Sequence, residues 1–242
     1  MRTMAFSTRN AREITRDPLT FVFGIVLPVL LIAMIRALTN AIGGANPAFA
    51  MDNFAPGMAV FSLTFVMLFS SMLVSGDRAS AFLARLFASP LRASDYILGY
   101  SLPVFVIGLL QAAVCLLVAL PFGLVPNNLP AAMVSLIPTV VLMTGLGLFL
   151  GTALTDKQSG GIFPIVINVA TLMSGTWFEL KLIGGWFAAI SYALPFAHAV
   201  DAARLALKGD FQGALPHMGW VLLYAAAVYA LAVWIFRRKM RQ

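Results

Sequence analysis

Long apolar runs without a charged residue at their centre are the feature that most constrains this chain. A helix that spans a lipid bilayer needs about 20 predominantly apolar residues. The runs lack the strict alternation of barrel strands, so they are predicted as helices. The expected fold is therefore an all-α membrane protein with six transmembrane helices, at residues 19–38, 56–75, 97–120, 131–154, 161–178 and 218–236.

The composition agrees with a chain that lipid solvates. Of the 242 residues, 61% are apolar and 10% are charged, whereas soluble domains average about 45–50% apolar and about 25% charged residues. The net charge of +7 comes from clusters beside the apolar runs. No basic segment is interleaved with aromatic residues, so nucleic-acid binding is not expected. The first apolar run is long for a signal peptide, and a retained span is predicted.

The basic residues are distributed unevenly between the loops. With six spans, twelve Lys and Arg residues fall on one side of the membrane and four on the other. Because positive residues concentrate in cytoplasmic loops, both termini are predicted to be cytoplasmic. The chain is treated as one transmembrane domain over residues 1–242, in which an even number of spans returns the C-terminus to the side of the N-terminus.

The N-terminal segment 1–17 is predicted to be an amphipathic helix at the inner surface of the membrane. Arg9, Arg12 and Arg16 lie at positions i, i+3 and i+7, which share one helix face. Arginines on such a face suit acidic lipid headgroups. The alternative is a basic arm that only sets the topology.

The loop between the second and third spans, residues 76–96, contains a second amphipathic pattern. Arg78, Arg85 and Arg92 are seven residues apart and form one stripe on a helix. An apolar sector lies to one side of this stripe, and Pro90 ends the helix. Such a helix either offers side chains to a soluble partner or lies in the interface, and periodicity alone does not separate these alternatives. The apolar sector consists of Phe82, Leu83, Leu86 and Phe87.

The segment 179–216, between spans five and six, is too apolar for a free loop and too short for a domain. It is predicted to be an outer re-entrant hairpin of one or two short helices, covered by protein or water at membrane depth. Asp201 and Arg204 are spaced to form an ion pair within it. Trp177, at the entry to the hairpin, suits the membrane interface.

Other motifs point to packing rather than chemistry. Gly147 and Gly151 form a Gly-x-x-x-Gly pattern that favours close helix contact, within the subunit or across a dimer. Cys115 lies in an apolar run, and His198 and His217 have no Cys or Glu at metal-ligand spacing. No catalytic residue and no metal site are therefore predicted.

The order of several short motifs resembles the membrane subunit of the type-2 ATP-binding-cassette exporter family, which includes anthracycline-resistance and polysaccharide-export permeases. The resemblance covers essentially the whole chain. Where that family commonly has Glu, Gly-Thr and an aromatic-Pro pair, this sequence has Asp77, Ala79-Ser80 and Thr176-Trp177-Phe178. The motifs that carry the resemblance are Arg16-Asp17-Pro18 with Pro28, Asp77-Arg78 with Leu83 and Leu86, Ser89-Pro90-Leu91, Ser174-Gly175, Pro195 and Arg204.

The resemblance implies a permease subunit in a bacterial plasma membrane, paired with a second copy or a homologous permease and with an ATPase subunit. Asp77, Arg78, Arg85, Leu86 and their neighbours would then form the coupling helix. The 242 residues contain no Gly-x-x-x-x-Gly-Lys-Ser/Thr loop, so ATP and Mg²⁺ would be bound by the partner and this chain would hold no cofactor.

Other functions compete with this prediction. An ATP-independent secondary carrier or channel is the main alternative, but carriers usually place ionisable residues at mid-span and none is found there. A membrane scaffold or an enzyme is the third reading, and the lack of buried acid–base groups disfavours an enzyme. The expected cargo is an amphipathic drug, lipid or glycan.

Overall fold

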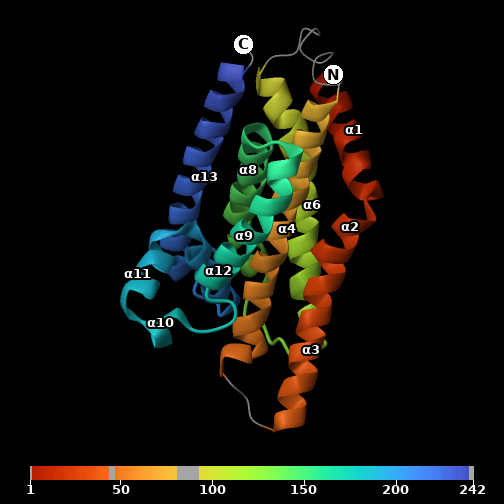
Figure 1. The fold of residues 1–242 in the computed structure, drawn as a ribbon. Coiled ribbons are helices and arrows are strands. Elements are labelled where there is room, and N and C mark those ends of the chain that lie inside the picture. The colour runs from red at the N-terminus through yellow and green to blue at the C-terminus, as the bar shows by residue number, and fades with distance from the viewer. Residues whose placement is uncertain (1, 44–46, 81–92, 240–242) are drawn as a thin grey trace.

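The computed structural model describes residues 2–43, 47–80 and 93–239, and these are helical with short connections (Figure 1). No β-strand occurs within these ranges. The all-α membrane class is therefore confirmed. Five helical stretches of this part of the chain are long and apolar enough to cross a membrane: Pro18–Ile42, Met51–Ala79, Asp95–Ala119, Leu129–Ala153 and Phe211–Phe236.

The first third of the chain forms a bent helical arm. Helix α1 spans Arg2–Arg16. The next residue, Asp17, caps α2 (Pro18–Phe21), because its carboxylate accepts a hydrogen bond from the Leu19 amide at 3.1 Å. One π-helical stretch, Val22–Val26, leads into α3 (Leu27–Ile42). Gly43 ends α3 with a φ of +68°, a left-handed conformation that glycine adopts at little cost.

The middle of the chain supplies the helices of the core. A short 3₁₀ turn, Pro47–Phe49, precedes the 29-residue helix α4 (Met51–Ala79). Helix α6 (Ala93–Ala119) runs back, and α7 (Leu129–Ser135) starts at Asn128, whose side chain accepts from the Ala131 amide. Helix α8 (Ile137–Ala153) follows α7 directly, and together they form one apolar helical stretch, Leu129–Ala153.

The last third contains one short apolar helix, a hairpin of three small helices and the final long helix. A Thr155–Gln158 capping box begins α9 (Asp156–Met173). Gly175 then turns the chain with a φ of +70°. The remaining helices are α10 (Leu180–Ile183), α11 (Gly185–Ala193), α12 (Pro195–Leu207) and α13 (Phe211–Lys239).

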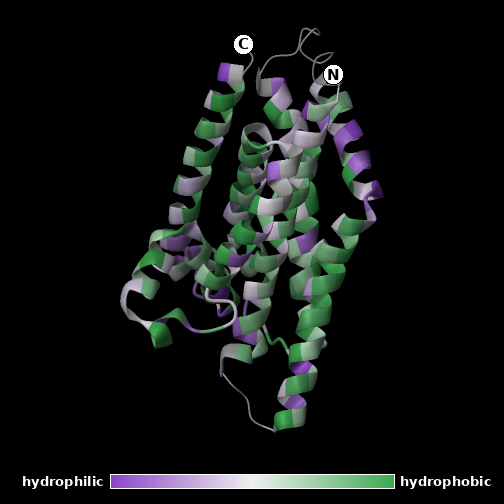
Figure 2. Ribbon diagram, viewed as in Figure 1, coloured by the Kyte–Doolittle hydropathy of each residue, from purple (hydrophilic) through white to green (hydrophobic). Residues whose placement is uncertain are grey.

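Helix α4 is the centre of the bundle. It packs against α3, α6, α8, α9 and α12, and a larger share of it is buried than of any other candidate span. The two ends of the chain lie at the same end of the bundle, which we call the termini end, and α10–α12 lie toward the opposite, hairpin end (Figure 1). Apolar residues dominate α3 and α13, whereas polar residues gather on α1 and near α12 (Figure 2).

Three predicted boundaries are corrected by the structure. Helix α9 ends at Met173 and the chain turns at Gly175, so the fifth predicted span (161–178) ends earlier than predicted, and its described apolar part is Gly161–Met173. The loop predicted at residues 76–96 is shorter in the structure, because α4 continues to Ala79 and α6 begins at Ala93. The predicted hairpin 179–216 ends earlier, because α13 starts at Phe211.

Candidate functional site

The last turn of α4 carries a carboxylate that joins three helices at the termini end. Asp77 is 5% exposed. Arg9 of α1 holds it with two nitrogens, Nη1 at 2.5 Å from Oδ2 and Nη2 at 2.8 Å from Oδ1. Tyr100 of α6 donates its hydroxyl to Oδ2 at 2.6 Å. A fork-shaped arginine contact of this kind fixes orientation as well as charge.

The ion pair outweighs the effect of burial on Arg9. Burial by itself lowers the pKa of Arg9, but the hydrogen bond and the charge of Asp77 raise it, and the net pKa is above the ordinary value. Glu13, one turn along α1, adds a second ion pair at 2.6 Å. The guanidinium is therefore permanently charged and directed at α4.

Further contacts dock α1 along α6 rather than on lipid alone. Phe6 meets the Tyr100 ring edge-on with centroids 4.8 Å apart and covers Gly99. Asn10 is fully buried and donates to the Gly99 carbonyl at 3.1 Å. The predicted arginine face is thus divided: Arg9 points into the bundle, whereas Arg12 and Arg16 are exposed.

Arg78 is adjacent to Asp77 and turns to the opposite neighbour of α4. Its Nη1 donates to the carbonyl oxygens of Gly151, Thr152 and Leu154 at 2.8, 2.6 and 3.1 Å. These carbonyls lie at the C-terminal end of α8, where a cation is favoured by the helix dipole and by acceptors that lack helical partners.

Together, Arg9, Asp77, Arg78 and Tyr100 form what we call the anchor cluster. It ties α1, α6 and α8 to the last turn of α4, directly before residues 81–92. Asp77 and Arg78, which were predicted on the coupling helix, lie on the last turn of α4 and bond to neighbouring helices, and their coupling role stays a prediction. The other predicted coupling residues lie outside the described residues: Phe82, Leu83, Arg85, Leu86 and Pro90.

The Gly-x-x-x-Gly pattern lies at the contact between α8 and α4. A Cβ on Gly147 would lie 2.7 Å from the Met67 carbonyl oxygen, and a Cβ on Gly151 would lie 2.7 Å from the Ser71 carbonyl oxygen. The two helix backbones approach within a distance that only glycine permits. Of the two alternatives left by the sequence, the structure places this contact within the subunit.

At the hairpin end, Arg204 of α12 joins three segments. Its Nε donates to the Asn53 carbonyl at the start of α4, and its Nη2 donates to the Gly175 carbonyl after α9, both at 2.9 Å. The predicted pair with Asp201 is present at 3.7 Å. Burial lowers the pKa of Arg204, and the charge of Asp201 opposes that effect.

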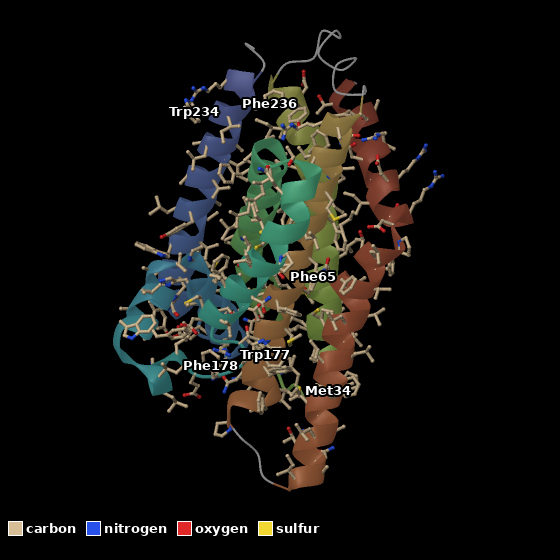
Figure 3. All side chains as sticks on the ribbon, in the orientation of Figure 1. Met34, Phe65, Trp177, Phe178, Trp234 and Phe236 are labelled. Atoms are coloured by element: carbon tan, nitrogen blue, oxygen red, sulfur yellow. The ribbon has the colours of Figure 1, made fainter. Side chains whose placement is uncertain are left out.

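Two further predicted hairpin residues have packing roles. Pro195 is buried at the first turn of α12, where a missing amide is tolerated. Trp177 packs edge-on against Phe54 of α4, with ring centroids 5.6 Å apart. Figure 3 shows Trp177 and Phe178 at the hairpin end, far from Trp234 and Phe236. Trp177 therefore contacts the core as well as the surroundings.

The ABC-2 type transporter family profile matches residues 1–207, which is most of the chain. The chain belongs to the ABC-2 type transporter family. This permease is also similar to ABC transporter G family member 20 of Dictyostelium discoideum, with 27% identity over 180 residues. The matched part covers 72% of the chain and 25% of the relative, so the permease spans about a quarter of that protein's length.

One side-chain contact of the permease, between two histidines, was not predicted from the sequence. His198 of α12 and His217 of α13 lie with their Nδ1 atoms 2.7 Å apart, and His198 Nε2 is 2.9 Å from the Tyr192 carbonyl. Because a carbonyl oxygen only accepts, the proton of that contact belongs to His198 Nε2. The two residues are 19 positions apart on separate helices, so the spacing rules for contacts within one helix do not predict their contact.

The described part of the permease holds no group of three His, Cys, Asp or Glu side chains that could bind a metal ion. Cys115 is buried. Within that part, the charged residues with defined partners gather at the two ends of the bundle rather than at mid-span. The arrangement favours mechanical roles, in which charges hold helices together.

Proposed function

We propose that this permease is the membrane half of an ATP-driven exporter that moves an amphipathic drug, lipid or glycan out of the cytoplasm. Membership of the ABC-2 type transporter family supports the permease role. ATP and Mg²⁺ would be bound by an ATPase subunit, since the 242 residues lack a phosphate-binding loop. Two permeases, identical or homologous, would form the pathway between them.

The observation that carries this proposal is the position of α4. Its last turn holds the anchor cluster, and its first turn supplies the Asn53 carbonyl that Arg204 binds. A helix of 29 residues is about 43 Å long, and α4 is buried on most sides. A displacement of residues 81–92 by a closing ATPase would therefore reach the hairpin end through one stiff element.

The same mechanism assigns a role to the neighbouring helices. Asp77 would pull α1 and α6 with α4 through Arg9 and Tyr100, and Arg78 would pull α8. The four helices α1, α4, α6 and α8 would then tilt as a unit rather than bend separately. The termini end would face the cytoplasm of a bacterial cell, in agreement with the bias of basic residues.

Co-purification of the ATPase tests the proposed docking. Arg85→Glu and Leu86→Asp should each reduce the ATPase recovered with the permease at least fivefold, because they place negative charge on the proposed docking helix. Arg12→Glu is the matched control, since Arg12 is an exposed cation at the same end of the bundle. Equal recovery with all three variants would remove the docking helix from the mechanism.

Reconstitution tests the energy source. Vesicles that contain the permease and its ATPase should accumulate an amphipathic cargo only with ATP and Mg²⁺. Uphill transport by the permease alone, driven by a pH or sodium gradient, would contradict the proposal and support a secondary carrier.

A further inference from the structure

A cavity of about 220 Å³ lies at the hairpin end of the permease. The start of α4, the turn after α9 and all three hairpin helices contribute to it. Its volume suits the head of a lipid rather than a whole lipid molecule. The residues that line it are Asn53, Ser174, Gly175, Phe178, Glu179, Leu180, Lys181, Tyr192, Asp201 and Arg204.

One wall of the cavity is formed by three polar side chains that hold one another in place, Tyr192, Asp201 and Arg204. Tyr192 donates its hydroxyl to Asp201 Oδ2 at 3.1 Å, and burial together with the charge of Asp201 raises the pKa of Tyr192 to about 12. Arg204 Nη1 lies 3.7 Å from Asp201 Oδ1, which is longer than a hydrogen bond. Both atoms therefore retain hydrogen-bonding capacity for a ligand.

The rim of the cavity carries two exposed charges of opposite sign, and the carboxylate of Glu179 also acts on Arg204 through its charge. Glu179 and Lys181 are exposed, and in the described part of the permease neither side chain makes a hydrogen bond or an ion pair. They lie at the start of α10, two residues apart. The cavity thus offers one open carboxylate and one open ammonium group, in addition to the Asp201–Arg204 pair on its wall.

Aromatic and apolar groups complete an amphipathic site. Phe178 and Tyr192 line the cavity, and an aromatic ring face attracts a cationic group. Beside Lys181, Leu182, Ile183 and Trp186 are 80%, 54% and 74% exposed. Exposed apolar side chains next to a charged cavity suit a ligand with a polar head and apolar tails.

We propose that this cavity binds the zwitterionic head of a phospholipid-like amphiphile. The phosphate would meet Lys181 and Arg204 Nη1, and the ammonium group would meet Glu179, Asp201 and the aromatic rings. A head with a negative charge alone would gain only the first set of contacts. The proposal that the head binds here depends only on the cavity. The identification of the amphiphile as the exported cargo rests in addition on the proposed function.

Direct binding to the full permease, purified in mild detergent without its ATPase, tests the site. The probes are dihexanoyl phosphatidylethanolamine and dihexanoyl phosphatidylglycerol, which share tails and phosphate and differ in the ammonium group. The first should bind more tightly. Glu179→Gln should weaken only the ethanolamine lipid about tenfold, and Lys181→Gln should weaken both, because each removes one charged contact.

Two features keep the result interpretable. Glu179 and Lys181 are exposed, so their variants should retain the unfolding temperature of the parent, and Arg36→Gln is a control cation toward the same end that does not line the cavity. Equal affinity for both lipids, or unchanged ethanolamine-lipid affinity in the Glu179 and Lys181 variants, would overturn the proposal.

A second arm separates the two sources of such a head. With the ATPase present in vesicles, ATP-dependent transfer of a labelled ethanolamine lipid that falls in Glu179→Gln would identify the exported cargo. Specific binding without ATP-dependent transfer would identify a resident bilayer lipid. Neither result depends on the docking test with Arg85 and Leu86, so failure of the site and failure of the proposed function are distinguishable.

Discussion

At the scale of single residues, neighbouring positions have different tasks. Asp77 and Arg78 are adjacent in the chain, yet Asp77 bonds to α1 and α6, and Arg78 bonds to α8. A helix turns about 100° per residue, so adjacent side chains leave it in different directions. One turn of α4 can therefore hold partners on two sides.

Replacement of Asp77 should loosen α1. Asp77→Asn removes the charge that compensates Arg9, and we expect a loss of about 1–3 kcal/mol, because Arg9 is partly exposed and the pair is only half buried. Thermal unfolding of the purified permease measures the change. In a double-mutant cycle with Arg9→Gln, the interaction free energy between Arg9 and Asp77 should account for most of this loss.

Glu13 provides the matched control. It pairs with the same guanidinium from the surface of α1, and exposed pairs at i, i+4 contribute about 0.3–0.5 kcal/mol. Glu13→Gln should therefore change the unfolding temperature little. Equal destabilisation by Glu13→Gln and Asp77→Asn would show that burial of the carboxylate is unimportant.

The two glycines of α8 should resist any added side chain. Gly147→Ala and Gly151→Ala place a methyl group against the backbone of α4, and overpacking of this kind costs about 1–3 kcal/mol. Gly161→Ala on α9 is the control, since a Cβ there meets nothing within 4 Å. The yield of monodisperse permease and its unfolding temperature report the difference. Similar behaviour of all three variants would contradict the close contact.

At the scale of elements, the hairpin depends on contacts with α4 and with the turn after α9. Helix α12 is mostly buried, with Ala and Val side chains against its neighbours, whereas α10 and α11 expose apolar residues. Helix α11 meets α12 and α9. The inner helix thus belongs to the bundle, and the outer two lie where their own side chains contact the surroundings.

Arg204 is the main polar link between these elements. Arg204→Met leaves the Asn53 and Gly175 carbonyls without their donor and Asp201 without its nearest cation. We expect amide hydrogen exchange in residues 174–207 to accelerate at least tenfold, since bonds from a charged donor contribute about 1.5–3 kcal/mol. Lys208→Gln removes one exposed bond of 3.3 Å to Asn53 and should change exchange little. Unchanged exchange in Arg204→Met would assign the link to apolar packing.

At the scale of the whole molecule, the arrangement places both termini at one end and the hairpin toward the other (Figure 1). Cysteines introduced at Thr15 and Gln212, which are both exposed, should therefore react with a membrane-impermeant maleimide from opposite sides. The native Cys115 is buried and should give little background. Labelling of Thr15→Cys and Gln212→Cys from the same side would contradict the topology.

Much of the fold was predictable because it depends on contiguous residues. The apolar runs indicated the positions of the long helices, and Asp17-Pro18 indicated where α1 stops. The fifth span was predicted too long, since hydropathy continues through Trp177 and Phe178 although Gly175 has already turned the chain. The contacts of Phe54 and Arg204 with this turn determine that bend, and neither is local in sequence.

The candidate sites also contain features that the sequence predicts and features that only the tertiary structure determines. Composition and charge bias by themselves determined that the chain is a helical membrane protein, because transfer of apolar residues into lipid and the distribution of basic residues are additive along the chain. Only the tertiary structure decided that Arg9 meets Asp77 across 68 positions and that His198 meets His217. Such pairs depend on the rotation and depth at which helices pack, and these follow from side-chain shape at every interface together.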